Sequence, residues 1–203
     1  MPSKTRSVII IPTWNRLDLL KQILSALKNQ NDKSFGILVV DNGSSDGTRD
    51  FLIKKSQESF QENIPLCSLL LNNNRGFALA NNLAFSFAFE FLKPEYFFIL
   101  NNDTLPDPDF IGKLCDKANH YLEKDPEIDK KGFPCLAHKK EWRVGSFAPL
   151  IENYFNRGMT DSAGVKVYPD GSAINRGMGI PVSKYTSDEE VFGPSGAAAM
   201  YLS

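Results

Sequence analysis

Four short apolar runs divide the first 100 residues of the chain, at residues 8–11, 37–40, 67–71 and 96–100. Apolar runs of this length without polar alternation are typical of strands buried on both faces of a sheet. We therefore predict four buried strands at these positions. The first should stop at Pro12, because proline has no amide hydrogen to donate within a sheet.

The intervals between the runs carry apolar residues at helical spacing. In the first interval they recur every three or four positions and form one stripe, made up of Leu17, Leu20, Ile23, Leu24 and Leu27. This pattern predicts an amphipathic helix. Further helices are predicted from near Thr48, over about Phe77–Leu92, and over about Phe110–Leu122.

Strands that alternate with helices indicate a parallel sheet with right-handed crossovers. We therefore predict an α/β fold with a mostly parallel, Rossmann-like sheet and flanking helices. In such a sheet the loops that follow the strands meet at one edge, and open α/β sheets bind ligands there. The loops expected at this edge are 13–16, 41–42, 74–76 and 101–103.

The pattern becomes less regular after residue 110. Residues 123–147 are charged and irregular, which predicts an insertion or a long loop. A strand is predicted at Gly164–Tyr168, and residues 191–202 should form a turn of small residues that leads into a buried segment. We predict one domain over 1–203, with a ligand-binding half at about 1–110 and a second half at about 111–203.

Composition limits the classes of function. The chain has 203 residues and a net charge of −1, so nothing in its bulk charge favours nucleic acid or an anionic membrane. Its three cysteines form no close-spaced pair, which favours a reduced compartment. No run of about 18 apolar residues could span a membrane, and the apolar stretch 8–11 is too short for a signal peptide. A cytoplasmic location without nucleic-acid partners is therefore expected.

Charged residues at the predicted edge indicate the chemistry. Asp103 follows the fourth strand and could hold Mg²⁺ or Mn²⁺ against a phosphate, since both ions prefer oxygen ligands. Asp41 could accept hydrogen bonds from a nucleobase or a ribose, and Arg16 or Arg75 could offset phosphate charge. The residues taken singly leave other interpretations open: Asp103 and Asp41 as turn residues, and the arginines as surface residues.

Three familiar nucleotide or metal sites do not match. The chain has no Gly-rich P-loop, and its first strand–helix turn lacks the glycines of a dinucleotide site. The loop that begins at Asp41 has Leu52 at its twelfth position, where a calcium-binding EF-hand needs glutamate.

The sequence resembles the family 2 glycosyltransferases of the GT-A fold. Four motifs in order carry the resemblance: VIIIPTWNR at 8–16, VVDNGSSDGT at 39–48, NRGFALANN at 74–82 and LNNDT at 100–104. The segments SAGV at 162–165, DG at 170–171 and GPSGAAAMY at 193–201 further resemble the rhamnosyltransferase-like branch. The stretch 123–147 has no counterpart in the resemblance.

The resemblance implies an inverting transfer of a sugar from a nucleoside diphosphate to an acceptor hydroxyl. The sugar would be rhamnose if the branch holds, and the setting cell-surface polysaccharide synthesis. The acceptor would be a saccharide or a lipid-linked saccharide, and the protein cytoplasmic or peripheral at the inner face of the membrane. The residues expected to hold the donor are Pro12, Thr13, Asn15, Arg16, Asp41, Asn42, Asn74, Arg75, Gly76, Asn81 and Asn102.

The metal motif of the resembled family is usually Asp-x-Asp, whereas this chain reads Asn101-Asn102-Asp103. Asp103 is therefore the expected ligand of a divalent Mg or Mn cofactor, and the diphosphate should supply further oxygens. The metal would stabilise the charge that develops on the leaving diphosphate.

An inverting transfer also needs a general base. Relatives carry an acidic motif some tens of residues beyond the GPSGAA segment, so the base is expected beyond Ser203 and the C-terminal part of the domain is expected to be incomplete. Asp188, Glu189 and Glu190 are interpreted as a solvated turn. Two rival hypotheses stay open: an inactive nucleotide-sugar-binding module, and a nucleotidyltransferase, whose Gly-rich loop the Pro12–Asn15 turn does not match.

Overall fold

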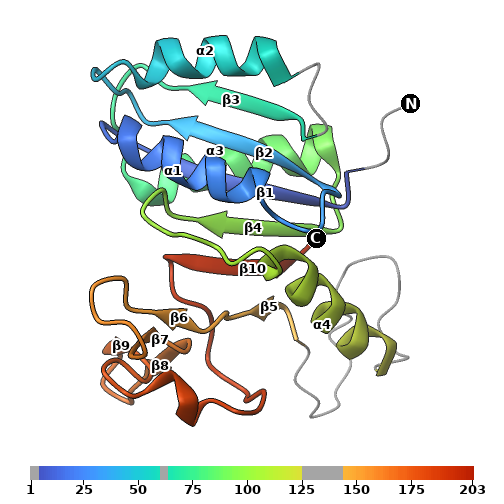
Figure 1. Ribbon diagram of the computed structural model, residues 1–203, viewed down its shortest axis with the longest axis vertical. Helices are drawn as coiled ribbons and strands as arrows, with labels where there is room; N and C mark the ends of the chain where they lie inside the picture. The colour runs from blue at the N-terminus through green and yellow to red at the C-terminus, as the bar shows by residue number, and fades with distance from the viewer. Residues whose placement is uncertain (1–4, 60–63, 125–143) are drawn as a thin grey trace.

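A six-stranded sheet forms the centre of the computed structural model, which describes residues 5–59, 64–124 and 144–203. The strand order is β3-β2-β1-β4-β10-β5 (Figure 1). The strands are β1 (Ser7–Thr13), β2 (Phe35–Asp41), β3 (Leu66–Leu70), β4 (Tyr96–Leu100), β10 (Ala198–Leu202) and β5 (Ser146–Phe147). Strands β1 to β4 are parallel, and β10 runs antiparallel to both β4 and β5. The predicted α/β fold with a mostly parallel sheet is confirmed.

Helices cover both faces of the sheet. One face carries α1 (Leu17–Lys28), α2 (Thr48–Ser59) and α4 (Phe110–Lys124), and the other carries α3 (Phe77–Phe87) with the π-helical turn η1 (Ala88–Leu92) (Figure 1). The predicted helices are therefore all present. The last turn of the third helix widens, because the amide of Lys93 bonds to the carbonyl of Ala88 five residues earlier.

The core follows the alternation of side chains along the buried strands. Ile9 and Ile11 of β1 pack toward α1, and Val8 and Ile10 pack toward α3. The contact face of α3 consists of small residues at a spacing of four, since Ala80, Ala84 and Ala88 are all fully buried. These small side chains let the helix approach the sheet closely.

The predicted stop of the first strand at Pro12 is wrong, since β1 continues through Pro12 to Thr13. The pairing partners explain the difference. β4 pairs with β1 only as far as Ile10, whereas β2 pairs along all of it, with Val40 opposite Pro12. Pro12 thus lies where the strand has a neighbour on one side only, so the missing amide hydrogen is tolerated there.

Residues 144–203 form the lower part of the molecule in Figure 1 and complete the sheet. They contain the hairpins β6 (Ile151–Glu152) with β7 (Thr160–Ser162) and β8 (Val165–Val167) with β9 (Ala173–Asn175), and a short 3₁₀ turn η2 (Val182–Lys184). The strand predicted at Gly164–Tyr168 and the buried segment predicted within 191–202 are confirmed as β8 and β10.

Most of the insertion predicted at 123–147 lies outside the described residues. Its described ends are ordered elements, since α4 reaches Lys124 and β5 joins the central sheet at Ser146–Phe147. Strand β5 pairs with β10 through Met200 and Tyr201.

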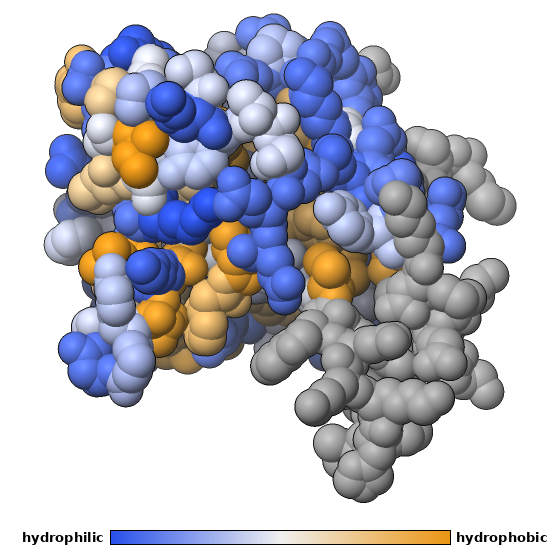
Figure 2. Space-filling model, turned by 90° about the horizontal axis from the view of Figure 1, so that it is seen from below, coloured by the Kyte–Doolittle hydropathy of each residue, from blue (hydrophilic) through white to orange (hydrophobic). Residues whose placement is uncertain are grey.

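The part that residues 144–203 form carries exposed apolar side chains, with Phe155 94% and Phe192 78% exposed. Figure 2 views the molecule from this side and shows apolar side chains in patches between polar ones. Within the described ranges, no helix has the length and apolar content needed to cross a membrane.

Candidate functional site

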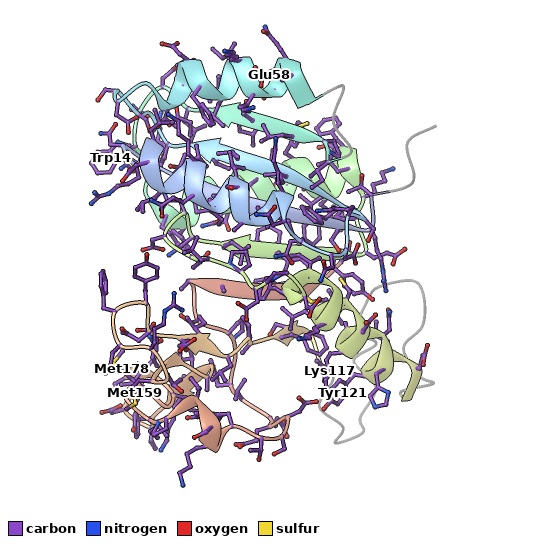
Figure 3. All side chains as sticks on the ribbon, in the orientation of Figure 1. Trp14, Glu58, Lys117, Tyr121, Met159 and Met178 are labelled. Carbon is purple, nitrogen blue, oxygen red and sulfur yellow. The ribbon has the colours of Figure 1, made fainter. Side chains whose placement is uncertain are left out.

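The polar loops after β1, β2, β3 and β4 meet at one edge of the sheet, as expected of parallel strands. The edge is marked by Trp14, whose half-exposed ring lies where the strand arrows point (Figure 3). The side-chain amide of Asn102 donates to the hydroxyl of Thr13 at 2.9 Å, and the backbone amide of Asn42 donates to the carbonyl of Thr13 at 2.9 Å. Thr13 therefore joins the ends of β1, β2 and β4.

Asn15 ties the loop after β1 to the loop after β2. Its side-chain carbonyl accepts the backbone amide hydrogen of Ser45 at 2.7 Å, and its own backbone amide donates to the Ser44 hydroxyl at 2.9 Å. Asn15 has a φ of 50°, a left-handed conformation that asparagine tolerates better than most residues. The side-chain carbonyl is thus committed to holding the two loops together.

Asp41, at the end of β2, is fully buried. Its Oδ1 accepts the backbone amide hydrogen of Ser44 at 3.0 Å, whereas Oδ2 has no hydrogen-bond partner among the described residues. A buried carboxylate oxygen without a partner is costly, because it loses its hydration and gains nothing in return. The position suits an acceptor kept for a ligand.

A group of amides joins the loop after β2 to the loop before α3. The Asn42 side chain donates to the Asn74 side chain at 3.0 Å and to the Gly76 carbonyl at 3.3 Å, and it accepts the Arg75 amide hydrogen at 2.8 Å. The same oxygen of Asn74 also accepts the Gly76 amide hydrogen at 2.8 Å. Loop 74–76 is therefore held in one conformation.

Asp103 lies in the turn after β4 and is exposed to solvent. The turn is fixed by two hydrogen bonds from Thr104 to the Asn101 carbonyl and by one from the Asn101 amide to the Ala197 carbonyl. Among the residues that the structure describes, none forms a hydrogen bond or an ion pair with the Asp103 carboxylate.

The residues at this edge fit a cation that is bound together with its ligand. The described ranges contain no group of three His, Cys, Asp or Glu side chains that could hold a metal. A single carboxylate supplies a hard oxygen ligand, which suits Mg²⁺ or Mn²⁺ when phosphate oxygens complete the coordination. A tight metal site without nucleotide is therefore not expected at Asp103.

Four other predicted residues lie at or near the edge. Arg16 and Arg75 are exposed, and Pro12 is partly buried at the end of β1. Asn81 lies further along α3 and is buried. Its side-chain amide donates to the Phe77 carbonyl at 2.9 Å, and its side-chain oxygen has no hydrogen-bond partner within the part of the chain that the structure describes. The structure thus brings the predicted loops together, with Asn81 one helical turn behind them.

Asp46 is a site residue that sequence reasoning missed. Its carboxylate accepts the Leu17 amide hydrogen at 3.0 Å, at the start of α1, and the Thr48 amide hydrogen at 3.1 Å, at the start of α2. Desolvation of Asp46 works against the charged form, but hydrogen bonds from the Thr48 hydroxyl and from these amides outweigh it and lower the pKa of Asp46. The signal was present in the SSDGT segment, which places a capping residue two positions before Thr48.

We expect Asp46→Ala to lower the free energy of unfolding by about 1–3 kcal/mol, because two helix starts lose a hydrogen-bond acceptor. The pKa of Asp46 is depressed in the folded state, so its contribution is present at neutral pH and is lost as pH falls through that depressed pKa. Urea unfolding at pH 7 and at pH 3 measures the effect. An equal difference between wild type and variant at both pH values would contradict the charged capping role.

The acidic segment at 188–190 is exposed to solvent, as expected of a solvated turn, and two of its carboxylates form ion pairs at the surface. Asp188 lies 2.5 Å from the Nζ of Lys117 on α4, and Glu189 forms an ion pair with Arg176. These two carboxylates are therefore engaged in contacts within the protein.

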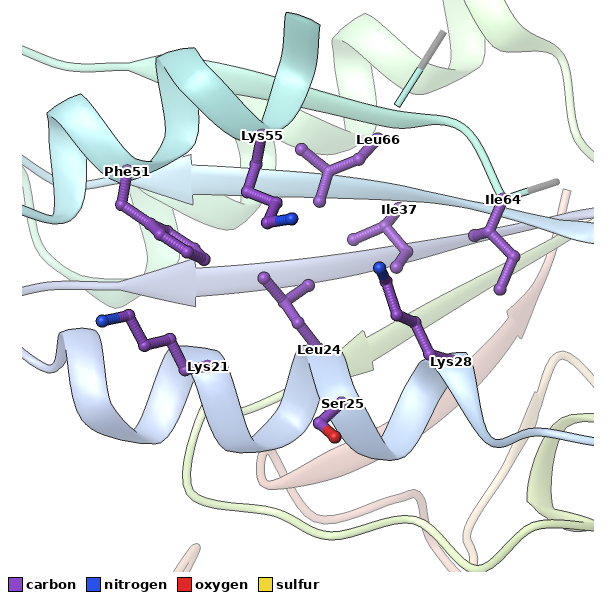
Figure 4. Close-up of a pocket in the computed structure, with 9 residues that line it drawn as sticks. All are labelled: Lys21, Leu24, Ser25, Lys28, Ile37, Phe51, Lys55, Ile64 and Leu66. Atoms are coloured by element: carbon purple, nitrogen blue, oxygen red, sulfur yellow. The ribbon is translucent and has the colours of Figure 1, made fainter. Parts of the chain in front are cut away.

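A cavity of about 240 Å³ lies between α1 and α2, away from the edge loops (Figure 4). Its walls are mainly apolar, and lysines stand around its mouth: Lys21, Lys28 and Lys55. Lys21 lies 5.4 Å from the centre of the Phe51 ring, and Lys55 pairs with Glu58 at 2.6 Å. None of the residues that line the cavity belongs to the predicted site.

The parallel sheet and the polar loops at its edge define a nucleotide-binding type of α/β domain. The chain belongs to glycosyl transferase family 2, whose family model matches residues 8–124. The matched residues include β2 to β4, β1 from its second residue onward, and all the predicted donor and metal residues. The predicted membership of family 2 is confirmed.

Individual relatives are more distant. Over 80 residues the chain is 39% identical to the uncharacterized glycosyltransferase YfnE of Bacillus subtilis, a match that covers 39% of this chain and 19% of YfnE. It is 29% identical over 156 residues to the undecaprenyl-phosphate 4-deoxy-4-formamido-L-arabinose transferase of Salmonella paratyphi A, covering 75% of this chain and 45% of the transferase. The chain thus spans less than half the length of these curated relatives.

The fold also matches that of a solved structure. The mannosyltransferase PcManGT from Pyrobaculum calidifontis, in complex with GDP-Man and Mn²⁺, superposes with a TM-score of 0.50 at 22% sequence identity, covering 73% of this chain and 36% of that protein. This likeness confirms the GT-A type of fold.

Proposed function

We propose that this chain is an inverting glycosyltransferase, or the donor-binding part of one, that transfers a sugar from a nucleoside diphosphate to an acceptor hydroxyl. The half at about 1–110 binds the donor and the half at about 111–203 faces the acceptor. The acceptor is a saccharide or a lipid-linked saccharide of cell-surface polysaccharide synthesis, and the protein works at the inner face of the membrane. Membership of family 2 and a relative that acts with undecaprenyl phosphate support this proposal.

The single observation that carries the proposal is Asp41. Its unpartnered oxygen is buried at the end of β2, beside the loops that Asn15 and Thr13 join. A nucleobase imide or a ribose hydroxyl would donate to this oxygen and remove the cost of leaving it without a partner. Exclusion of water from the buried Asp41 side chain strengthens such a hydrogen bond.

Asp103 is the residue that would hold the divalent metal, with the diphosphate completing the coordination. When bound, the metal supplies Lewis-acid stabilisation of the leaving diphosphate. The exposed arginines Arg16 and Arg75 add positive charge near the same edge. The resemblance to the rhamnosyltransferase-like branch supports rhamnose as the sugar.

The test is a panel of UDP-, GDP- and dTDP-sugars in a thermal-unfolding assay with Mn²⁺ or Mg²⁺. A ligand that binds only the folded state stabilises it by about 2.7 kcal/mol at one hundred times its dissociation constant. We expect one nucleotide series to raise the melting temperature, and only with metal present. If no nucleoside diphosphate or its sugar stabilises the chain, the proposal fails.

The engagement of Asp188 and Glu189 in ion pairs favours a second candidate, a binding module that holds the donor without transferring it. A free carboxylate near the acceptor would be needed as general base. The stabilising nucleotide sugar is then incubated with saccharide acceptors and its hydrolysis and transfer are measured. Binding without turnover would support the module.

A further inference from the structure

The side chain of Asn42 is directed at a neighbouring loop. Asn42 is only 5% exposed, its Nδ2 contacts two acceptors in loop 74–76, and its Oδ1 accepts the Arg75 amide hydrogen. An asparagine amide has two N–H donors and one oxygen acceptor. Both donors are thus engaged by the loop, which leaves little capacity for a ligand.

Gly43 contributes a second, independent contact with the same region. It has a φ of +81°, and a Cβ added there would lie 2.6 Å from the Cα of Asn73. The backbones of the two loops therefore touch at this glycine. Only glycine fits both the left-handed conformation and the close approach.

We propose that Asn42 and Gly43 form a latch that positions loop 73–76 for the donor, and that Asn42 acts through this loop rather than by contacting the donor. The inference rests on the proposed function, because the donor is what the loop is positioned for. Loop 73–76 leads into α3 at Gly76, whose φ of +80° sets the direction of the helix start. An unlatched loop would have to be ordered each time the donor binds, which weakens affinity.

The change from amide to carboxylate separates the latch from simple packing. In Asn42→Asp the side chain keeps its shape, but its carboxylate faces the Asn74 side-chain oxygen and the Gly76 carbonyl, which both accept hydrogen bonds. Burial and the acceptor oxygens raise the pKa of such a carboxyl. Acidification therefore protonates it and restores one donor, so the latch of the variant should close as pH falls.

Hydrogen exchange tests the latch without any ligand. In Asn42→Ala the Arg75 amide should exchange roughly tenfold faster, because its acceptor is lost. The Ser45 amide, which bonds to Asn15, is the internal control and should keep its rate. Asn72→Asp is the control for the charge that Asn42→Asp introduces. It places a carboxylate on an exposed position of the neighbouring turn and should leave the exchange rates at Arg75 and Ser45 unchanged. Unchanged exchange at Arg75 in Asn42→Ala would overturn the latch.

Calorimetry then tests the link to the donor, using whichever of UDP, GDP and dTDP stabilises the wild-type chain most. We expect Asn42→Asp to bind the nucleotide roughly tenfold more weakly than wild type at pH 7.5. The ratio of the two dissociation constants should approach one as pH falls toward about 5. Asn42→Ala should show a similar loss that does not recover on acidification. If the ratio of the dissociation constants of Asn42→Asp and wild type stays constant with pH, the proposed role of the amide is contradicted.

A double-mutant cycle decides whether Asn42 acts through the loop. If it does, the losses caused by Asn42→Ala and Asn74→Ala overlap, and the double variant binds about as weakly as either single one. If Asn42 contacts the nucleotide directly, the two losses add, and the inference is wrong. Should Asn42→Asp not fold, this cycle still gives a result.

A pair of glycines offers a matched test of the backbone contact. Gly43→Ala and Gly47→Ala both place alanine at a positive φ, of +81° and +91°. A Cβ at Gly47 meets only a Leu17 methyl group, at 3.8 Å, so that variant carries the conformational strain without the clash. We expect Gly43→Ala alone to speed exchange at Arg75 and to weaken nucleotide binding. Equal effects of the two substitutions would refute the contact.

Failure of the latch and failure of the proposed function give different results. If wild type binds no nucleoside diphosphate, the function fails, while hydrogen exchange still reports on the latch. If wild type binds the nucleotide but the Arg75 amide exchanges at the same rate in Asn42→Ala as in wild type, the inference alone fails.

Discussion

Asp103→Ala is expected to lose the Mn²⁺-dependent affinity for a nucleoside diphosphate. The Asp103 carboxylate is exposed and forms no hydrogen bond or ion pair with the described residues, so its removal should leave the fold intact. Loss of an outer-shell partner costs roughly 10–100-fold in metal affinity, and loss of the coordinating carboxylate should cost more. Calorimetric titration with and without Mn²⁺ measures the difference, using whichever of UDP, GDP and dTDP stabilises the wild-type chain most.

Asp107→Ala is the matched control for this prediction, since Asp107 is an exposed carboxylate in the same loop. It should retain the full metal dependence of wild type. Unchanged Mn²⁺-dependent affinity in Asp103→Ala would show that the assignment of the metal ligand is wrong.

Asp41→Asn is expected to weaken nucleotide binding and to stabilise the unliganded protein. The substitution keeps the acceptor for the Ser44 amide but replaces the unpartnered carboxylate oxygen with an amide group, which cannot accept a hydrogen bond. Loss of a charge-assisted hydrogen bond should reduce affinity by roughly 10–100-fold. Removal of a buried charge should raise the free energy of unfolding by about 1 kcal/mol or more.

Titration with the free nucleoside as well as its diphosphate measures the first effect, and urea unfolding measures the second. The metal dependence of binding should stay as in wild type, because the change is at the other end of the ligand. Asp116→Asn, on the exposed side of α4, serves as control. A less stable Asp41→Asn variant would mean that the buried carboxylate stabilises the unliganded fold.

The hydrophobic pattern predicted the fold well, because the strands and helices of the first half differ strongly in period. The run Tyr96–Leu100 was predicted with the bounds of β4, and four of the five predicted stripe residues of α1 are buried. The end of β1 was predicted wrongly, because the hydrophobic pattern carries no information about which strands pair beside it. Whether Pro12 ends a strand depends on how far β4 extends beside it, and pairing lengths are not written in local sequence.

The candidate site was predicted as a meeting of loops but not as a hydrogen-bonded unit. Sequence motifs pointed to Asn42 and Asn74 as donor residues, whereas the structure shows that their side chains bond to one another. The double role of Asp46 at α1 and α2 was also missed, because Leu17 and Asp46 are 29 residues apart. Contacts between loops depend on the tertiary fold, so they cannot be derived from spacing along the chain.

The position of β10 has a practical consequence for any shortened version of this protein. Strand β10 pairs with all five residues of β4, and the Ala197 carbonyl just before it accepts the Asn101 amide hydrogen at the start of the turn that carries Asp103. A chain cut at Gly196 would leave β4 as an unprotected apolar edge, a ready template for intermolecular pairing and aggregation. It would also release the turn that carries Asp103, so expression boundaries should fall beyond Leu202.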